Sequence, residues 1–313
     1  IQQVLADEFE GRNLNEIFSF IDEKPLGSAS IAQVHAARLV TGEDVVLKVQ
    51  KPGVETILYT DLNVVHWATK ILEKAVPKIK FASLSDIVDE IKTRMVREVD
   101  FIEEAQNLDD FIQYLNVSGN QAATAPKVYH QFSTRRVLTM QRLYGVSLTD
   151  FDVVKKYAKD PTQVLITAMN TWFGSLMLCK SFHADLHAGN LMLLEDGRIG
   201  FIDFGIVGQL NPEVWTACMA FMDALQHTNY TAMAENMLKM GMTHQKIDTQ
   251  VLADDLERLF SGVLLADPQE ILSSNPADLN DIMMDMIGVG ERHGIKFPRD
   301  FALLFKQMLY FDR

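Results

Sequence analysis

The chain has little cysteine, no long uninterrupted apolar run and no excess of basic residues. Only Cys179 and Cys218 occur in 313 residues, both in apolar, helix-like contexts, so we expect buried free thiols and a reducing compartment. Lys and Arg number 29 against 42 Asp and Glu, a net charge of −13. Because no basic stripe is present, a nucleic-acid partner is excluded. A single cation or a metal ion can still bind a small anion locally.

Membrane-spanning and secretory signals are also missing from the sequence. The most apolar segment, Val164 to Cys179, is 16 residues long and is interrupted by polar residues. It is shorter than the roughly 20 residues that cross a bilayer, and it predicts a buried helix. No signal peptide opens the chain. Ile1 is not an initiator methionine and the pattern at Arg313 is still helical, so we expect a piece of a longer protein.

The apolar patterning predicts an α+β fold whose N-terminal part is rich in strands. Residues Ile31 to Val40 and Val45 to Val49 predict two strands joined by a hairpin. A helix is predicted after Pro52 and Gly53. A second helix is predicted from Ser83 or Ser85, through Val99 and Ile102, to about Leu115.

The rest of the chain is predicted to be mainly helical. Arg136 to Met140 reads as a strand, and short apolar runs interrupt the helical pattern between Phe182 and Val207. The length suggests two lobes, and we predict an N-lobe over residues 1–140 and a C-lobe over 141–313. Methionines recur at helical spacing and predict core packing rather than an exposed groove: Met233, Met237, Met240, Met242, Met283, Met284 and Met286.

The strongest chemical signal is His183-Ala-Asp185-Leu-His-Ala-Gly-Asn190. An aspartate can orient a hydroxyl or accept its proton, and an asparagine five residues later can hold a metal ion; protein kinases use this spacing in their catalytic loop. Asp203-Phe204-Gly205 follows 13 residues after Asn190. In kinases this aspartate binds the Mg²⁺ that bridges the ATP phosphates. The two motifs in this order predict Asp185 as the catalytic group and Asn190 and Asp203 as metal ligands.

A phosphate-binding lysine is predicted on the strand before these motifs. Lys48 lies within Val45-Val-Leu-Lys48-Val49, the pattern of the kinase lysine strand, and glutamates follow it on a predicted helix. The helix partner of Lys48 could be Glu98, Glu103 or Glu104.

The loop that would cover the phosphates has no GxGxxG pattern. The sequence Pro25-Leu-Gly27-Ser28-Ala29-Ser30 stands in its place, and its small residues let backbone amides approach a phosphate. Serine and alanine restrict φ more than glycine does, so we expect a stiffer loop. Met140 to Leu143 follow a strand, and Met140 and Leu143 are candidates for a hinge against adenine, with plain strand-end packing as the alternative.

Together, Pro25 to His35, Lys48, Glu98-Val-Asp100 with Glu104, His183 to Asn190 and Asp203 to Gly205 resemble the UbiB family of atypical kinases, also called aarF-domain or ADCK-like kinases. The resemblance covers essentially all of the chain. It implies a protein-kinase-like fold with a small β-rich N-lobe and a larger helical C-lobe. It also implies that Gly27 to Ser30 match the alanine-rich loop of the family.

The resemblance implies further roles and partners. Glu98 and Asp100 match the family's ExD motif, and Glu104 matches its helix glutamate. ATP or ADP and Mg²⁺ are the implied cofactors. Family members support isoprenoid quinone and other prenyl-lipid metabolism, so a prenyl lipid or quinone precursor and a membrane surface are implied partners. The implied location is a plastid, a mitochondrion or the bacterial cytoplasm. The family's N-terminal KxGQ motif and its C-terminal extension are not in this sequence.

The residues also favour a phosphotransferase or ATPase that is not a conventional protein kinase. After Gly205 the chain reaches Asn211-Pro212 and a helical pattern, with no Ala-Pro-Glu and little room for a peptide-docking activation loop. Two alternatives stay open. One is a nucleotide-gated regulator or scaffold with negligible turnover, and the other is a small-molecule phosphotransferase of the aminoglycoside-kinase kind.

Overall fold

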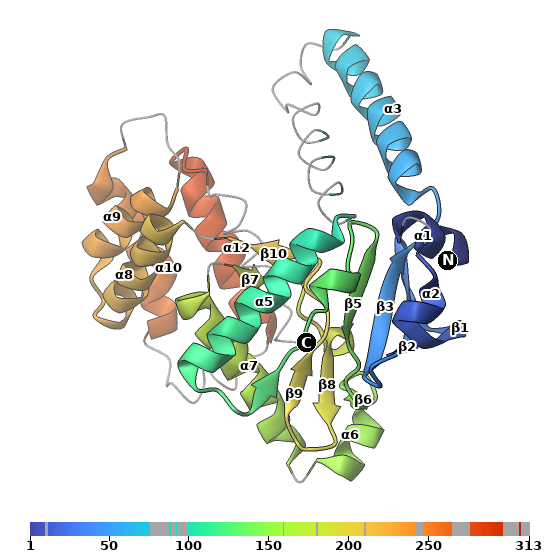
Figure 1. Cartoon of the computed structure of the whole chain (residues 1–313). Coiled ribbons are helices and arrows are strands. Elements are labelled where there is room, and N and C mark those ends of the chain that lie inside the picture. Colours follow the sequence, from blue (N-terminus) through green and yellow to red (C-terminus); the bar gives the residue numbers. More distant parts are fainter. Residues whose placement is uncertain are drawn as a thin grey trace. The chain divides into compact units, whose positions relative to one another are not determined.

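The computed structural model describes residues 1–9, 12–75, 88, 92, 95, 99–158, 160–179, 181–209, 211–241, 247–264, 276–296 and 307 (Figure 1). The chain divides into two compact units. The first joins Ile1–Cys179 to Ala188–Val207, and the second joins Lys180–His187 to Gly208–Arg313. This division differs from the predicted lobes at 1–140 and 141–313, which stay a prediction.

A four-stranded antiparallel sheet begins the first unit (Figure 1). Its strands lie in the order β1 (Phe18–Ser28), β2 (Ala32–Leu39), β3 (Asp44–Gln50) and β5 (Val137–Gln141). The predicted hairpin of β2 and β3 is confirmed, and Gly42 turns it with a φ of +102°, a value that favours glycine.

One face of this sheet packs against the N-terminal helix α1 (Gln2–Glu8), which the short helix α2 (Leu14–Ile17) follows. Leu47 and Val49 of β3 are fully buried there with Val4 and Leu5 of α1. Successive residues of a strand point to opposite faces. Lys48, between Leu47 and Val49, therefore points to the other face of the sheet.

Two helices follow β3 in the first unit. The helix predicted after Pro52 and Gly53 is confirmed as α3 (Val54–Ala75). The predicted single helix to Leu115 is wrong, because Val99 is a turn residue, Asp100 is extended, and a new helix, α5 (Phe101–Ser118), begins at Phe101. The side chain of Asp100 accepts the N–H of Ile102 and caps the new helix. The predicted helix start at Ser83 or Ser85 lies outside the described residues.

A second sheet completes the first unit. Its strands lie in the order β4 (Ala123–Thr124), β9 (Ile199–Phe201), β8 (Leu191–Leu194) and β6 (Gly145–Ser147). The short helix η2 (His130–Phe132) precedes β5, and η3 (Ala188–Asn190) leads into β8. A Cβ on Gly145 would lie 2.3 Å from the carbonyl oxygen of Leu193, so β6 and β8 approach too closely for a side chain there.

Helices α6 (Phe151–Tyr157) and α7 (Pro161–Leu178) belong to the same unit. The prediction of a buried helix at Val164 to Cys179 holds for one face of α7 only. Ala168 and Trp172 are buried, whereas Phe173 is 41% exposed. Among the described residues, no helix combines the length and the apolar character that crossing a membrane requires.

The second unit contains β7 (Phe182–His183), the end of β10 (Val207–Gly208) and the helices α8 (Pro212–Gln226), α9 (Tyr230–Met240), α10 (Thr249–Leu264) and α12 (Pro276–Arg292). Methionine core packing is confirmed for four residues, each at most 6% exposed: Met233, Met237, Met240 and Met286. Met284 is 62% exposed, which corrects its assignment to the core. Met242 and the side chain of Met283 lie outside the described residues.

The two cysteines are free thiols, but they are half-buried rather than buried as predicted. Cys179 follows α7, a helix that is buried on one face only, and Cys218 lies in α8 beside a core cluster. Burial raises the pKa of the Cys179 thiol to about 11. Both side chains therefore behave as inert packing groups at neutral pH.

Candidate functional site

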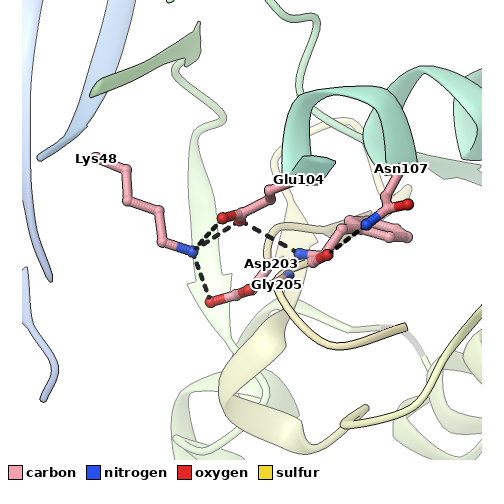
Figure 2. Close-up of polar contacts among 6 residues, drawn as sticks. Lys48, Glu104, Asn107, Asp203 and Gly205 are labelled. Atoms are coloured by element: carbon pink, nitrogen blue, oxygen red, sulfur yellow. Dashed lines mark hydrogen bonds and ion pairs between the residues drawn. The ribbon is translucent and has the colours of Figure 1, made fainter. Parts of the chain in front are cut away.

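Lys48 projects from β3 into a cluster of charged side chains (Figure 2). Its Nζ lies 2.7 and 2.9 Å from the two carboxylate oxygens of Glu104 and 3.3 Å from Oδ2 of Asp203. The side chains of Lys48 and Glu104 are 12% and 3% exposed, whereas that of Asp203 is 41% exposed. The cluster therefore has a buried end at Glu104 and an open end at Asp203.

The start of α5 decides which glutamate meets Lys48. Asp100 caps the helix, so Phe101 enters the core and Glu104 lies one turn further along the same face. The ring of Phe101 lies 5.5 Å from the Lys48 Nζ, a cation–π distance. Glu103 is exposed, which removes it as a candidate partner, and Glu98 lies outside the described residues.

The charges of this cluster hold Lys48 in its protonated form. Burial lowers the pKa of Lys48, but the nearby carboxylates of Glu104 and Asp203 outweigh that effect, and its pKa stands above the usual value. Burial also raises the pKa of Glu104, and the Lys48 ammonium opposes this. At neutral pH the cluster thus presents a fixed ammonium beside the exposed carboxylate of Asp203.

The side chain of Asp203 holds the Asp203-Phe204-Gly205 segment in a turn. Oδ1 of Asp203 accepts the N–H of Gly205 at 2.9 Å, while its Oδ2 faces Lys48. Phe204 is 2% exposed, and its ring centroid lies 4.8 Å from that of Phe111 on α5. The buried phenylalanine anchors the segment and leaves the aspartate at the open end of the cluster.

Helix α5 also holds the backbone of Phe204 through both its N–H and its carbonyl. Glu104 Oε1 accepts the Phe204 N–H at 3.5 Å, and Asn107 Nδ2 donates to the Phe204 carbonyl at 3.2 Å. Glu104, Asn107 and Phe111 are spaced three and four residues apart, so they share one face of the helix. The sequence analysis missed Asn107, because a single asparagine in an amphipathic helix carries no motif.

Asn190 is placed beside the strand that leads to Asp203. It ends η3, and its carbonyl accepts the N–H of Ile202 at 3.1 Å. An amide oxygen and a carboxylate are hard ligands of the kind that Mg²⁺ takes. In the described part of the chain no cluster of three or more His, Cys, Asp or Glu residues could hold a metal ion. The donor chemistry of Asn190 and Asp203 by itself fits Mg²⁺.

Asp185 belongs to the second unit, in the turn after β7. Its N–H donates to Nδ1 of His183 at 3.2 Å. The next peptide is clamped by Gln307, whose Oε1 accepts the Leu186 N–H at 2.8 Å and whose Nε2 donates to the Leu186 carbonyl at 2.6 Å. Gln307 is 1% exposed, and no local pattern indicated that it contacts this loop.

The predicted phosphate loop is shorter than expected, because Gly27 and Ser28 still belong to β1. Ala29 donates its N–H to the Ala32 carbonyl at 2.9 Å, and Ser30 is an exposed bend residue. Lys51 donates to the Ala29 carbonyl and ties the turn to the end of β3. A Cβ on Gly27 would meet nothing within 4 Å, so sterics do not require glycine at this position.

The two hinge candidates lie at the end of β5. Met140 is 5% exposed, and it forms a bridge with Val128. Leu143 is half-buried and packs over Gly200. A Cβ added to Gly200 would lie 3.2 Å from Cδ1 of Leu143. Both side chains therefore have packing roles, and contact with adenine stays a prediction.

Residues 1–237 match the family model of the ABC1 atypical kinase-like domain. The chain belongs to this family. An aarF domain-containing protein kinase of Arabidopsis thaliana, named as chloroplastic, is 45% identical over 332 residues, covering 100% of this chain and 61% of the relative. A probable protein kinase UbiB of Azotobacter vinelandii is 31% identical over 251 residues, covering 79% of this chain and 46% of the relative.

The family assignment confirms the resemblance that the motifs suggested. A solved complex of Rv3197 with erythromycin from Mycobacterium tuberculosis matches with a TM-score of 0.73 at 24% identity, covering 100% of this chain and 77% of the other. The chain therefore has the expected α+β, kinase-like fold. It spans 61% of the length of the Arabidopsis relative and 60% of a Mycobacterium tuberculosis relative that is 33% identical.

Proposed function

We propose that this member of the ABC1 kinase-like family binds ATP and Mg²⁺ and acts as an atypical kinase or ATPase in isoprenoid quinone or other prenyl-lipid metabolism. The observation that carries the proposal is the Lys48 ammonium held between Glu104 and Asp203 at 2.7 to 3.3 Å. Lys48 stays protonated at neutral pH and lies beside the exposed carboxylate of Asp203. This pair suits a phosphate chain and the metal ion bound to it.

Each site residue has a role in this proposal. Lys48 would bind phosphate oxygens, with Glu104 orienting its ammonium. Asn190 and Asp203 would hold Mg²⁺, which neutralises charge on the transferred phosphoryl group when it is bound. Asp185 would position the attacking nucleophile.

The substrate class is proposed from the short connection after Gly205. Six residues, 206–211, separate Gly205 from the first residue of α8, Pro212. This leaves little chain for a peptide-docking loop and favours a small-molecule acceptor or water. The UbiB names of the bacterial relatives support quinone metabolism, and the chloroplastic names of the Arabidopsis relatives favour a plastid over a mitochondrion or the bacterial cytoplasm.

Asp203→Asn tests the proposal directly. Thermal-shift titrations with ATP, with and without Mg²⁺, measure nucleotide binding, and phosphate release measures turnover. We expect Asp203→Asn to weaken the Mg²⁺-dependent component of ATP binding by about tenfold or more. Asp109→Asn, which removes an exposed carboxylate paired with His130, is the matched control and keeps the wild-type response.

The two readouts separate the possible outcomes. An unchanged Mg²⁺-dependent affinity in Asp203→Asn contradicts the metal role of this residue. Binding without phosphate release, in the presence and absence of added lipid, contradicts the enzyme and indicates a nucleotide-gated regulator instead.

A further inference from the structure

Gln50, the last residue of β3, carries a buried amide that belongs to neither of the kinase-like motifs. The residue is only 2% exposed. Successive residues of a strand point to opposite faces, so Gln50 points to the same face of the sheet as Lys48, two residues before it. Burying an amide costs free energy unless its polar atoms are hydrogen-bonded. The hydrogen-bond partners of Gln50 therefore show which part of the chain it holds.

The amide nitrogen of Gln50 binds the backbone at the start of α5. Its Nε2 donates to the carbonyl of Val99, two residues before the helix, and to the carbonyl of Arg135 at 3.3 Å. The same Arg135 carbonyl accepts the N–H of Phe101, the first residue of α5, at 3.1 Å. Gln50 is thus bonded to the segment before the helix and shares an acceptor with the first residue of the helix.

These contacts complete the N-terminus of α5. The first N–H groups of a helix have no partner inside the helix. The Arg135 carbonyl accepts the N–H of Phe101, and the Asp100 side chain accepts the next one, that of Ile102. The guanidinium of Arg135 also lies 3.4 Å from Oδ2 of Asp100. Gln50 holds the carbonyl before Asp100 and the carbonyl of Arg135, so it joins both acceptors to the end of β3.

The position of Glu104 depends on this start, because Glu104 lies only three residues after Phe101. Each residue of a helix turns it by about 100°, so a start displaced by one residue would carry the glutamate away from its present face. Glu104 lies 2.7 and 2.9 Å from Lys48 Nζ, distances that a displaced helix would lose. Lys48 and Gln50 therefore act on α5 from one face of one strand, on the glutamate and on the start of the helix.

We propose that Gln50 is a positioning residue of this site, which places Glu104 against Lys48 by fixing where α5 begins. An amide suits this position because its single nitrogen carries two hydrogens, one for each carbonyl, whereas an ionised glutamate has no donor. The effect of Gln50 on the helix needs no nucleotide, and its effect on turnover rests on the proposed function.

Gln50→Met keeps an unbranched side chain of similar length and removes both donors. Native-state hydrogen exchange without nucleotide measures the result. The acceleration of exchange at residues 101–104 is expected to exceed that at residues 111–118 of the same helix by about tenfold. Gln50→Asn keeps the amide but shortens its reach by one methylene group. It is expected to give a smaller effect in the same direction, and it serves as the test where Gln50→Met does not fold.

Asn236→Leu is the matched control. Asn236 is 8% exposed, and its amide donates to the Ala232 carbonyl at 2.8 Å within α9, in the second unit. This variant also loses a buried amide, and it is expected to leave the exchange of residues 101–104 and the turnover unchanged. Equal acceleration in both halves of α5, or no acceleration in either Gln50 variant, overturns the proposal, because a general loss of stability has no preference for the start of the helix.

Steady-state phosphate release tests the consequence for the proposed reaction. Gln50→Met is expected to lower kcat by about tenfold or more and to change KM for ATP by less than about threefold, because a misplaced Glu104 no longer orients the Lys48 ammonium. A loss confined to KM contradicts the positioning role. A wild-type chain that releases no phosphate contradicts the proposed enzyme alone, since the exchange of residues 101–104 still decides the role of Gln50.

Discussion

Lys48→Met removes the ammonium that lies 2.7 and 2.9 Å from the two oxygens of Glu104. Methionine keeps an unbranched apolar stem of similar length over Phe101. Glu104 is only 3% exposed, so water cannot replace its lost partner. Removing one member of a buried ion pair costs about 3–5 kcal/mol. Because the Phe204 N–H remains within 3.5 Å and Glu104 can bind a proton, we expect a loss near the lower end, about 3 kcal/mol.

A double-mutant cycle separates this charge effect from a loss of packing. Lys48→Met combined with Glu104→Gln leaves no unpaired buried charge, so the double variant is expected to be more stable than Lys48→Met alone. Urea unfolding followed by circular dichroism, without nucleotide, measures each free energy of unfolding. Contacting residues typically show coupling of about 0.5–3 kcal/mol in such cycles.

The pH dependence supplies an independent check on the same reasoning. Burial raises the pKa of Glu104, and removing Lys48 raises it further because the ammonium opposes that shift. A carboxyl group with a raised pKa in the folded state contributes its stability below the unfolded pKa of about 4.3, and loses it as pH rises through the folded value. The deficit of Lys48→Met is therefore small in acid and grows toward neutral pH. A deficit that is independent of pH, or additive free energies in the cycle, would refute the buried-charge argument.

Three further predictions concern residues that support the site. Asn107→Ala removes the hydrogen bond to the Phe204 carbonyl, so Mg²⁺-dependent ATP affinity falls while metal-free binding is unchanged; an equal loss in both titrations contradicts a role through Asp203. Gln307→Leu removes the hydrogen bonds to the N–H and the carbonyl of Leu186, so the free energy of unfolding in urea is expected to fall by about 2–4 kcal/mol. An unchanged unfolding midpoint contradicts a stabilising role of Gln307. Iodoacetamide labels Cys179 slowly at pH 7.5 and faster as pH approaches about 11, because burial raises its pKa; fast labelling at neutral pH contradicts this.

Lys48 and Asp203 could be identified from sequence because their signals are local. The lysine lies within a short, almost wholly apolar strand, and the aspartate belongs to a triplet 13 residues after Asn190. The choice among Glu98, Glu103 and Glu104 could not be made from the residue pattern, and only the family resemblance pointed to Glu104. It depends on where α5 begins, and the apolar pattern runs on through Val99 as if one helix continued.

The start of α5 shows why the apolar periodicity alone predicted one continuous helix where the structure begins a new one. Asp100 adopts an extended conformation and accepts the N–H of Ile102, a local hydrogen bond that ends one pattern and begins another. This cap sets the rotation of the helix, and with it the face on which Glu104 is buried. A capping aspartate inside an apolar pattern was therefore the local signal that could have identified Glu104 without the family resemblance.

Asn107 and Gln307 could not be found from sequence at all, since their partners lie 97 and 121 residues away along the chain. Both use a side-chain amide to bind the backbone of a motif residue, and backbone groups are present at every position. Side-chain identity therefore gives no indication of which peptide will be bound. Such contacts are set by tertiary packing, here by Phe111 against Phe204 in the case of Asn107.

The arrangement of α5 links the two halves of the charged cluster. Glu104 contacts Lys48 from β3 and the N–H of Phe204, while Asn107 and Phe111 on the same helical face hold the rest of that residue. A shift of α5 along or around its axis therefore changes the lysine contact and the orientation of Asp203 together, because both depend on one rigid element. Since Glu104 is buried and Asp203 is exposed, the cost of such a shift falls on the buried contact with Lys48. The buried Lys48–Glu104 ion pair thus fixes the position of α5, and α5 in turn positions the exposed carboxylate of Asp203.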